Sequence, residues 1–407
     1  MESNSSRVFV IAAFIFVALF FIFLRISSYK ERERRQLEEE ANERRIHEEL
    51  EKETAHNIDE VSERVEDAFF NSYESNVYMR APGDIGEDKL KEIANSIDPL
   101  FGRVSLYSYT TSSSQEEGLD PVYDYYVGVN FDLYRTDEYY VLKAIQEEQF
   151  IPSALDKANT LKDVCEDFLN NNINDSMTDY EKELAVHDYI INNCEYAFSD
   201  DNDRTEFQAY GALVNHKAVC EGYARATALL LRLCGIEANL VSGDADSSGD
   251  SGGNEAASYV VLPDGKVAEG HMWDQVKIEG NWYNLDTTWD DPISEEPMLT
   301  YTYFNVSDEI LSNNHTWEEK DAATCNAMDA NYYVKNNSFF EDDASLKEYI
   351  SSQLASGSRE PIKCAYKEAD ISEEAMYFVF DYEGIDHYSY STHGVDGYTC
   401  LELYFNP

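Results

Sequence analysis

Basic side chains are scarce in this sequence of 407 residues. Its 31 lysines and arginines stand against 80 aspartates and glutamates, which leaves a formal net charge of −49. A nucleic-acid backbone is bound by a basic face that displaces counterions, so this balance argues against a nucleic-acid partner. It also disfavours adhesion of the globular part to an anionic lipid surface. Hydrophobic residues still make up 43% of the chain and aromatic residues 13%, which is too much for a disordered acidic tail. We therefore expect folded domains with an acidic, self-repelling surface.

Paired cysteine motifs and internal repeats are both lacking. The seven cysteines are irregularly spaced and none belongs to a C-x-x-C pair, which argues against zinc-ribbon and thioredoxin-type folds. Their odd number leaves at least one thiol free or paired between chains. A chain of this length does not need a disulfide framework to fold. The length itself favours two or three compact domains.

Residues 8–24 form an unbroken apolar run between Arg7 and Arg25. As a helix this run would be about 25 Å long, slightly short of a bilayer core of about 30 Å, and the two arginines can snorkel to close the gap. The alternative is a cleaved signal peptide, with an apolar region of about 7–15 residues and an A-x-A-like site. No such site follows Arg25. The sequence therefore predicts an uncleaved, single-pass membrane anchor.

Composition changes divide the rest of the chain into further parts. Residues 25–72 have sparse apolar positions that hold no heptad pattern, which favours a solvated helical stalk over a coiled coil. Residues 73–150 and 321–407 mix alternating stretches with an amphipathic segment, so each is expected to be a small α+β module. The predicted parts are a tail at 1–7, the anchor at 8–24, the stalk at 25–72, a module at 73–150, a core at 151–320 and a module at 321–407.

The segment that starts at Cys220 is predicted to be a buried helix, because Ala and Leu dominate it and Gly235 is a natural C-terminal stop. Cys220 would stand in its first turn. The partial positive charge of a helix N-terminus favours the thiolate, which is the reactive form of cysteine. A structural cysteine is usually buried and inert, as we expect for Cys194 and Cys234. Cys220 is therefore the candidate nucleophile.

A thiolate nucleophile works with an imidazole and with a third group that orients the imidazole. His271 begins an alternating stretch and Asp286 lies in the next one, with a hairpin-type turn at 279–281 between them. Neighbouring antiparallel strands would place these two side chains next to each other. Two other histidines, His187 and His315, are expected to be structural. His216, four residues before Cys220, is not favoured as the base.

Four runs of the sequence resemble the core of the transglutaminase-like superfamily: AYGALV, AVCEGYARATALLLRLCGI, GHMWDQV and WYNLDTTWDD. They occur in the order of that family, and the residues at 303–317 resemble the segment that follows the core in bacterial members. The resemblance implies a papain-like α+β core, with the catalytic cysteine at a helix N-terminus packed on an antiparallel sheet. It also implies Cys220 as nucleophile, His271 as general base and acid, and Asp286 as the orienting group.

Four more residues are candidates for the same site. Gln208 or Tyr210, on the segment that leads to Cys220, would add a side-chain donor for the oxyanion to the backbone N–H of Cys220. Trp273 and Trp289 would wall the site, although plain core packing explains them equally well. These motifs require no cofactor.

Two features depart from the family pattern or compete with it. Asp274 follows Trp273 where such members often carry Asn, and an extra loop precedes His271. A second loop has the D-x-D-x-S-G-x5-E spacing of a calcium site. Its flanks resemble strands instead of helices, so we expect a hairpin tip and no metal. The ligands of that spacing would be Asp244, Asp246, Ser248, Asp250 and Glu255.

The side of the membrane on which the soluble part would lie is open to two interpretations. Basic residues are denser after the apolar run than before it, which by the positive-inside rule favours the cytoplasm. The resemblance to bacterial surface members favours the outside. We predict an extracellular soluble part, because long domains translocate largely regardless of charge.

The sequence thus predicts a membrane-anchored thiol enzyme that acts on protein or peptide amides through an acyl-enzyme on Cys220. Hydrolysis, deamidation of glutamine and cross-linking of glutamine to an amine all share that intermediate, so the triad does not distinguish them. The alternative is a catalytically silent interaction module at the cell surface that has kept the fold.

Overall fold

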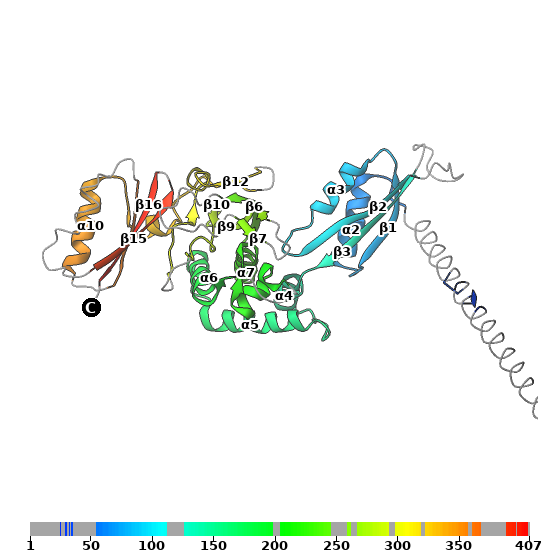
Figure 1. The fold of residues 1–407 in the computed structure, drawn as a ribbon, viewed down its shortest axis with the longest axis horizontal. Coiled ribbons are helices and arrows are strands. Elements are labelled where there is room, and N and C mark those ends of the chain that lie inside the picture. Colours follow the sequence, from blue (N-terminus) through cyan, green and yellow to red (C-terminus); the bar gives the residue numbers. More distant parts are fainter. Residues whose placement is uncertain are drawn as a thin grey trace, which may run out of the picture. The chain divides into compact units, whose positions relative to one another are not determined.

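The computed structural model describes most of the chain (Figure 1). By its internal contacts the chain divides into two units, one of residues 1–98 with 102–135 and one of residues 99–101 with 136–407. Both contain helices and antiparallel strands, so the fold is mixed α+β, as predicted. The described residues are 25, 29, 30, 32, 34, 35, 54–111, 126–197, 204–245, 259–261, 267–292, 298–318, 322–356, 360–367, 388–395 and 397–405.

The first unit is a three-stranded antiparallel sheet in the order β1-β3-β2, packed with two helices. The Arg135 guanidinium closes the unit by donating to the carbonyl oxygens of Ala68, Phe69 and Glu74. Its elements are α2 (Ile58–Phe70), β1 (Asn76–Pro82), α3 (Glu87–Asn95), β2 (Gly102–Thr111) and β3 (Tyr126–Arg135).

Helix α2 falls in the range predicted as a solvated stalk, yet it is part of this unit. Asn57 caps it by accepting from the Glu60 N–H, and one face of the helix is buried. The buried side chains recur at helical spacing among acidic neighbours, and a search for heptads overlooks such a short stripe. They are Val61, Val65, Ala68 and Phe69.

The prediction of a single-pass membrane protein finds no support in the structure. Within the described ranges, no helix combines the length and the apolar character that crossing a bilayer requires. The apolar run at 8–24, on which the prediction rested, lies outside the described residues. The membrane localisation, with its extracellular soluble part, is therefore corrected.

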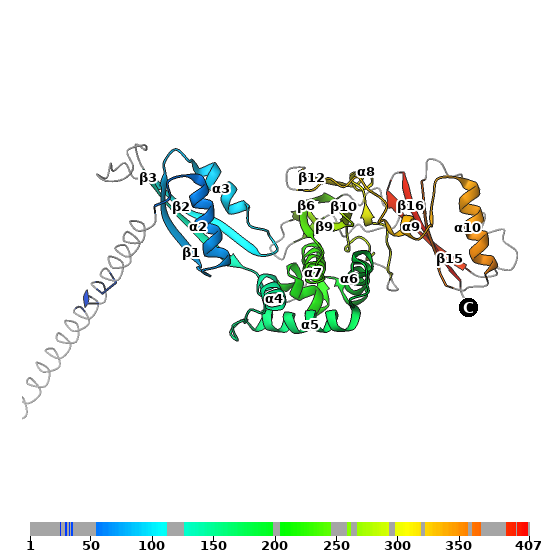
Figure 2. The same ribbon diagram turned by 180° about the vertical axis from the view of Figure 1, so that it is seen from behind.

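The second unit has a helical layer below a five-stranded sheet. Figure 1 and Figure 2 both show α7 between the sheet and α5. The helix at 179 starts with a capping box, in which Thr178 and Glu181 satisfy each other's backbone N–H groups. Buried side chains of α4 join the core of this unit, so the unit starts before residue 151, where the core was predicted to begin. The helices are α4 (Asp137–Gln146), α5 (Asp156–Asn172), α6 (Asp179–Asn193) and α7 (Cys220–Leu233).

The sheet has the order β11-β10-β9-β6-β12, and every neighbouring pair is antiparallel. Strands β9 and β10 form the predicted hairpin, in which Glu279 and Gly280 have φ values of 51° and 91°, as a type I′ turn requires. Helix α8 (Asp308–Leu311) follows β11. The strands are β6 (Ala238–Ala245), β9 (His271–Ile278), β10 (Asn281–Leu285), β11 (Phe304–Val306) and β12 (His315–Trp317).

Short elements complete this part of the unit. The predicted calcium spacing begins at Asp244 in β6, and its remaining residues lie outside the described ranges. The short elements are β4 (Glu195–Tyr196), the 3-10 helix η1 (Thr205–Phe207), the π-helix η2 (Gly211–Asn215), β5 (Lys217–Ala218), β7 (Tyr259–Val261) and β8 (Val267–Glu269).

The C-terminal part adds a four-stranded sheet in the order β13-β14-β16-β15 and helix α10. It shares the core of the second unit, since buried Tyr333 and Tyr398 belong to the same hydrophobic cluster as the helical layer. The Asn331 amide donates to the Phe304 carbonyl at 2.9 Å. The elements are α9 (Tyr332–Lys335), β13 (Phe339–Phe340), α10 (Asp343–Ala355), β14 (Ile362–Tyr366), β15 (Tyr388–Val395) and β16 (Tyr398–Phe405).

Candidate active site

Cys220 is the first residue of the 14-residue helix α7, after Val219 with its extended backbone. The start of the helix is fixed from outside, because the Val219 N–H donates to the Glu206 carbonyl at 3.0 Å. Gly222 permits this close approach, since a Cβ there would lie 2.3 Å from the same carbonyl oxygen. The thiol therefore stands at the positive end of a helix, and 9% of Cys220 is exposed.

The other six cysteines have surroundings that keep a thiol protonated and unreactive. Cys234 caps the C-terminus of α7, so this one helix has a cysteine at each end. Burial raises the pKa of Cys234 to about 11. Burial likewise raises the pKa of the remaining thiols: Cys194 and Cys400 to about 12 each, and also Cys165, Cys325 and Cys364.

His271 and Asp286 are brought together by the β9–β10 hairpin. His271 is the first residue of β9, and Asp286 follows Leu285, the last residue of β10, which pairs with Asp274. The chain beyond Leu285 thus runs alongside the start of β9. His271 Nε2 lies 2.6 Å from Asp286 Oδ2. The two residues are 3% and 1% exposed, respectively, so their interaction is shielded from solvent.

The Asp286 carboxylate is held by four donors. Its Oδ1 accepts from the backbone N–H groups of Thr288 and Trp289, each at 3.0 Å. Its Oδ2 accepts from His271 and lies 3.2 Å from His315 Nε2. Burial alone would raise the pKa of Asp286, but the charge of His271 and the bonds from both histidines hold it well below its usual range. Asp286 is therefore ionised.

The His271 imidazole is poised to carry a proton. Burial alone would lower its pKa, but the charge of Asp286 and the hydrogen bond to it outweigh burial and raise the pKa. The nearby Cys220 thiol acts in the same direction. Among the described residues His271 Nδ1 has no hydrogen-bond partner. Since Nε2 is committed to Asp286, Nδ1 is the nitrogen left to exchange a proton with Cys220 or a substrate.

Both tryptophans proposed as walls lie against this imidazole. The Trp273 ring stacks on His271 with centroids 5.9 Å apart, and the Trp289 ring lies 5.8 Å away at a tilt. Both indoles are buried. They exclude water from the His271–Asp286 contact and are also part of the hydrophobic core. The same two side chains therefore both pack the core and shield the site.

The segment before α7 places the two oxyanion candidates differently. A Cβ at Gly222 would lie 3.2 Å from the Gln208 carbonyl, so Gln208 passes beside the first turn of α7. Its side-chain Oε1 is buried and unpartnered within the described part of the chain. The Tyr210 ring instead faces the Lys157 ammonium of α5 at 5.8 Å. Gln208 therefore passes the helix that carries Cys220, whereas the Tyr210 ring faces α5.

Sequence reasoning missed Tyr196, which lies beside the thiol. Strand β4 pairs in parallel with β5, so that Tyr196 stands next to Ala218, two residues before Cys220. Its hydroxyl is buried and finds no partner among the residues described. Burial raises the pKa of Tyr196, and the charges of Cys220 and Asp286 raise it further. Two-residue strands leave no periodic signal in a sequence, so the pairing could not have been found there.

A second buried histidine–aspartate pair lies in the same unit. His187 Nε2 is 3.1 Å from Asp290 Oδ2, and its Nδ1 is 3.0 Å from Asp188 Oδ1. Burial alone would lower the pKa of His187, but these bonds and charges raise it to about 9. With both nitrogens committed, His187 is structural, as expected.

Within the described ranges, one group of side chains converges closely enough to suggest metal ligands. It consists of His271, Asp286 and His315, whose ligand atoms lie within 4.8 Å of one another. Their nitrogen–oxygen contacts of 2.6 and 3.2 Å are hydrogen-bond lengths. Hydrogen bonds therefore account for the approach of the three side chains.

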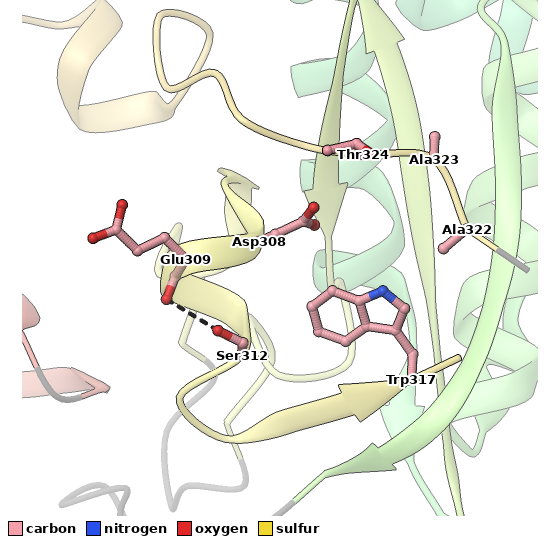
Figure 3. Close-up of a pocket in the computed structure, with 7 residues that line it drawn as sticks. All are labelled: Asp308, Glu309, Ser312, Trp317, Ala322, Ala323 and Thr324. Carbon is pink, nitrogen blue, oxygen red and sulfur yellow. Dashed lines mark hydrogen bonds between the residues drawn. The ribbon is translucent and has the colours of Figure 1, made fainter. Parts of the chain in front are cut away.

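A pocket of about 460 Å³ lies behind the aromatic wall (Figure 3). Trp317 lines it and packs against Trp273 at 5.7 Å, with Trp273 stacked in turn on His271. Asp308, another lining residue, already accepts from the Asn284 amide and the Cys325 N–H. The pocket contains none of the predicted site residues.

The transglutaminase-like superfamily model matches residues 167–287. This chain contains a transglutaminase-like domain. The matched range includes Cys220, His271 and Asp286.

Curated relatives and a solved structure share part of this chain. The human protein named "Kyphoscoliosis peptidase" is 25% identical over 146 residues, or 35% of this chain, and its mouse counterpart is 23% identical over 146 residues. The alignment spans 21% of the length of each relative. The solved structure described as a TGase covers 58% of each chain at 14% identity, with a TM-score of 0.26.

Proposed function

We propose that this protein is a thiol enzyme that attacks amide carbonyls of protein or peptide substrates and forms an acyl-enzyme on Cys220. The observation that carries the proposal is the buried His271–Asp286 pair, which leaves His271 Nδ1 unpartnered among the described residues and close to the Cys220 thiol. The match of residues 167–287 to the transglutaminase-like model supports it.

In the proposed reaction His271 and Cys220 form an imidazolium–thiolate pair. The sulfur attacks the amide carbonyl carbon, and the carbonyl oxygen becomes an oxyanion. Collapse of this intermediate breaks the carbon–nitrogen bond, while His271 Nδ1–H gives its proton to the leaving amine. The neutral imidazole then takes a proton from water or an acceptor amine, which attacks the thioester and releases the thiolate.

The oxyanion would be bound at the N-terminus of α7. The first N–H groups of a helix have no acceptor within the helix, so the Cys220 N–H is available to a substrate oxygen. We assign the side-chain donor to the Gln208 amide, and the buried Tyr196 hydroxyl is a further donor beside the thiol. An oxyanion with such preorganised donors is stabilised far more than in water.

The acyl acceptor decides between hydrolysis, deamidation and cross-linking, and the three reactions share the residues named above. The alternative is an interaction module that keeps the fold without catalysis. The low exposure of Cys220 and His271, at 9% and 3%, favours that alternative, because a substrate carbonyl has to reach the sulfur.

Selective alkylation of the full chain tests the proposal. At pH 6 an unassisted thiol is almost entirely protonated, whereas a thiolate paired with an imidazolium reacts. Iodoacetamide should therefore label Cys220 at least about tenfold faster than the other cysteines. Cys234, at the opposite end of the same helix, is the matched control, and Cys220→Ala should remove the fast label while Cys234→Ala keeps it. Equal labelling of Cys220 and Cys234 would favour the silent module.

A peptide library then tests the acyl-enzyme itself. Incubation with glutamine-containing and other peptides, followed by digestion and mass spectrometry, should show an acyl adduct on the Cys220 peptide. Gln208→Ala should lower the rate of acylation on the order of 100-fold by removing an oxyanion donor, without slowing alkylation, which forms no oxyanion. Fast alkylation of Cys220 with no adduct from any peptide would restrict the proposal to a reactive thiol.

A further inference from the structure

A second imidazole contacts the carboxylate that orients His271. His315 is the first residue of the edge strand β12, which pairs with β6. Its Nε2 lies 3.2 Å from Asp286 Oδ2, the same oxygen that accepts from His271 Nε2 at 2.6 Å. His315 is only 1% exposed. The nucleophile, base and orienting group of the proposed reaction are complete without it, so its place beside Asp286 needs an explanation.

His315 is neutral in this environment. Burial lowers its pKa, and the charge of His271 lowers it further against the opposing pull of Asp286. A neutral imidazole has a single N–H. Because a carboxylate oxygen can only accept, the His315 proton resides on Nε2 and is donated to Asp286. Its Nδ1 then has a lone pair and requires a donor.

Asn314 supplies that donor. The structure places Asn314 Oδ1 2.7 Å from His315 Nδ1, and Asn314 Nδ2 lies 2.8 Å from the Tyr303 hydroxyl. The two ends of an amide are assigned from their partners. A neutral His315 that donates from Nε2 therefore requires this amide to be turned over, with its NH₂ toward Nδ1 and its oxygen accepting from the Tyr303 O–H. Tyr303 is buried. In that orientation every donor of the chain Tyr303–Asn314–His315 meets an acceptor.

We propose that His315 is a positioning residue that acts through Asp286, sharing Oδ2 with His271 and weakening the hold of the carboxylate on the His271 proton. The inference rests on the proposed function. A second donor draws negative charge from Oδ2, and a neutral donor does so without placing another positive charge beside the imidazolium. His271 therefore releases its proton to a leaving amine more readily than it would from a pair with Asp286 alone.

The aromatic wall holds His315 in this position. Its ring lies 4.7 Å from Trp289 and 5.1 Å from Trp273, the same two indoles that flank His271. The centroids of the two imidazoles are 5.4 Å apart. A rotation of His315 would disturb this packing, so the contact with Asp286 is maintained by shape as well as by hydrogen bonding.

The pH dependence of Cys220 alkylation in the full chain tests the inference without a substrate. The rate should rise in two steps, first as the thiolate forms and again as His271 loses its proton. His271→Ala identifies the upper step by abolishing it. His315→Phe keeps a ring but removes the donor, and should move the upper step to higher pH by about half to one unit. His315→Gln, whose amide can donate, should move it back toward the wild-type position.

Other titratable groups near the pair are kept in both His315 variants, so the difference between their profiles and that of the wild type reports His315. They are Cys220 on α7, Tyr196 on β4, Asp274 on β9, and Asp290 and Tyr303 after β10. A merely structural His315 would lower the unfolding temperature and leave the upper step in place.

An unmoved upper step in a folded His315→Phe protein, or a move to lower pH, overturns the inference. If His315→Phe does not fold, Tyr303→Phe decides, because loss of its hydroxyl frees the Asn314 amide to turn and should shift the upper step in the same direction by a smaller amount. A wild-type profile without an upper step, together with unselective labelling of Cys220, would instead overturn the proposed function itself.

Discussion

The second unit has two buried histidine–aspartate pairs that resemble each other in most respects. Their aspartates, Asp286 and Asp290, are one helical turn apart in sequence, and the Asp290 N–H donates to the Asp286 carbonyl at 3.1 Å. In both pairs a ring Nε2 meets a carboxylate Oδ2. Partner charges raise the pKa of both histidines. A histidine that is buried and bonded to a carboxylate can therefore be either a structural residue or a candidate base, and another feature must distinguish the two.

The difference lies at the other ring nitrogen. His187 Nδ1 is bonded to Asp188, whereas His271 Nδ1 has no partner among the described residues and lies near Cys220. An imidazolium that donates from both nitrogens to carboxylates is locked in its protonated form. One that donates from a single nitrogen can transfer the other proton. The vacant nitrogen, and not the shifted pKa, marks the candidate site.

Substitution of the two aspartates should separate the pairs by the largest effect. Asp286→Asn should lower the rate of acyl-enzyme turnover on the order of 10⁴-fold, because an amide at this position disturbs the tautomer and orientation of His271. Asp290→Asn should leave turnover per folded molecule unchanged within about twofold and act on stability alone. Turnover is measured by release of product from a peptide found in the library screen. Similar losses in both variants would remove the distinction.

The stability of the protein at alkaline pH should report the structural pair. The folded pKa of His187 is about 9, above the unfolded value of about 6.5. Its contribution is therefore complete below about pH 6.5 and is lost as the pH rises through 9, by on the order of 3 kcal/mol. Chemical unfolding at pH 6 and pH 9.5 should show this loss in the wild type. His187→Gln should be less stable at pH 6 and should show a smaller difference between the two pH values, and an unchanged difference would contradict the assignment.

The reactivity of Cys220 should depend on one histidine and not on the other. His271→Ala should lower the alkylation rate of Cys220 at pH 6 by about 10–100-fold, since an unassisted thiol has little thiolate at that pH. His187→Gln should leave the rate unchanged within about twofold, because its ring has no contact with the thiol. The measurement is quantitative mass spectrometry of the Cys220 peptide after timed exposure to iodoacetamide. A slow His187→Gln protein that remains folded would show that the two pairs are coupled.

A third buried aspartate, Asp274, extends the comparison because it has no histidine. It is 1% exposed, and neither carboxylate oxygen has a hydrogen-bond partner among the described residues. Burial raises its pKa well above the ordinary value, and the charge of Asp286 raises it further. Its folded pKa exceeds the unfolded one, so stability is lost as the pH rises above the unfolded value. Asp274→Asn should stabilise the protein by about 1 kcal/mol at pH 8 and by less at pH 4, as measured by thermal unfolding.

Much of the fold around the candidate site is predictable because its signals are local. Gly235 ends α7, and the hairpin at Glu279 and Gly280 is specified by the two residues that adopt positive φ. These features place Cys220 at a helix start, and His271 and Asp286 on adjacent strands. The long-range contacts carry no such signal. Strand β12 has three residues, and its pairing with β6 depends on Gly243, where a Cβ would lie 2.1 Å from the Thr316 carbonyl.

That pairing explains why the contact between His315 and Asp286 escaped sequence analysis. Asp286 follows β10, whereas His315 begins the edge strand β12. The two residues are 29 positions apart in the sequence, so no periodic pattern relates them. The apolar run at 8–24 is the opposite case. There a strong local pattern predicted a membrane localisation that the structure does not support. Local patterns predict elements well, whereas their partners depend on the folded chain.

The turn that follows β10 has a consequence for hydrogen exchange. The amide protons of Thr288 and Trp289 are bonded to the Asp286 carboxylate, and that of Asp290 is bonded to the Asp286 carbonyl. All three should exchange with deuterated solvent only when this turn opens, so their protection measures how long the carboxylate stays in place.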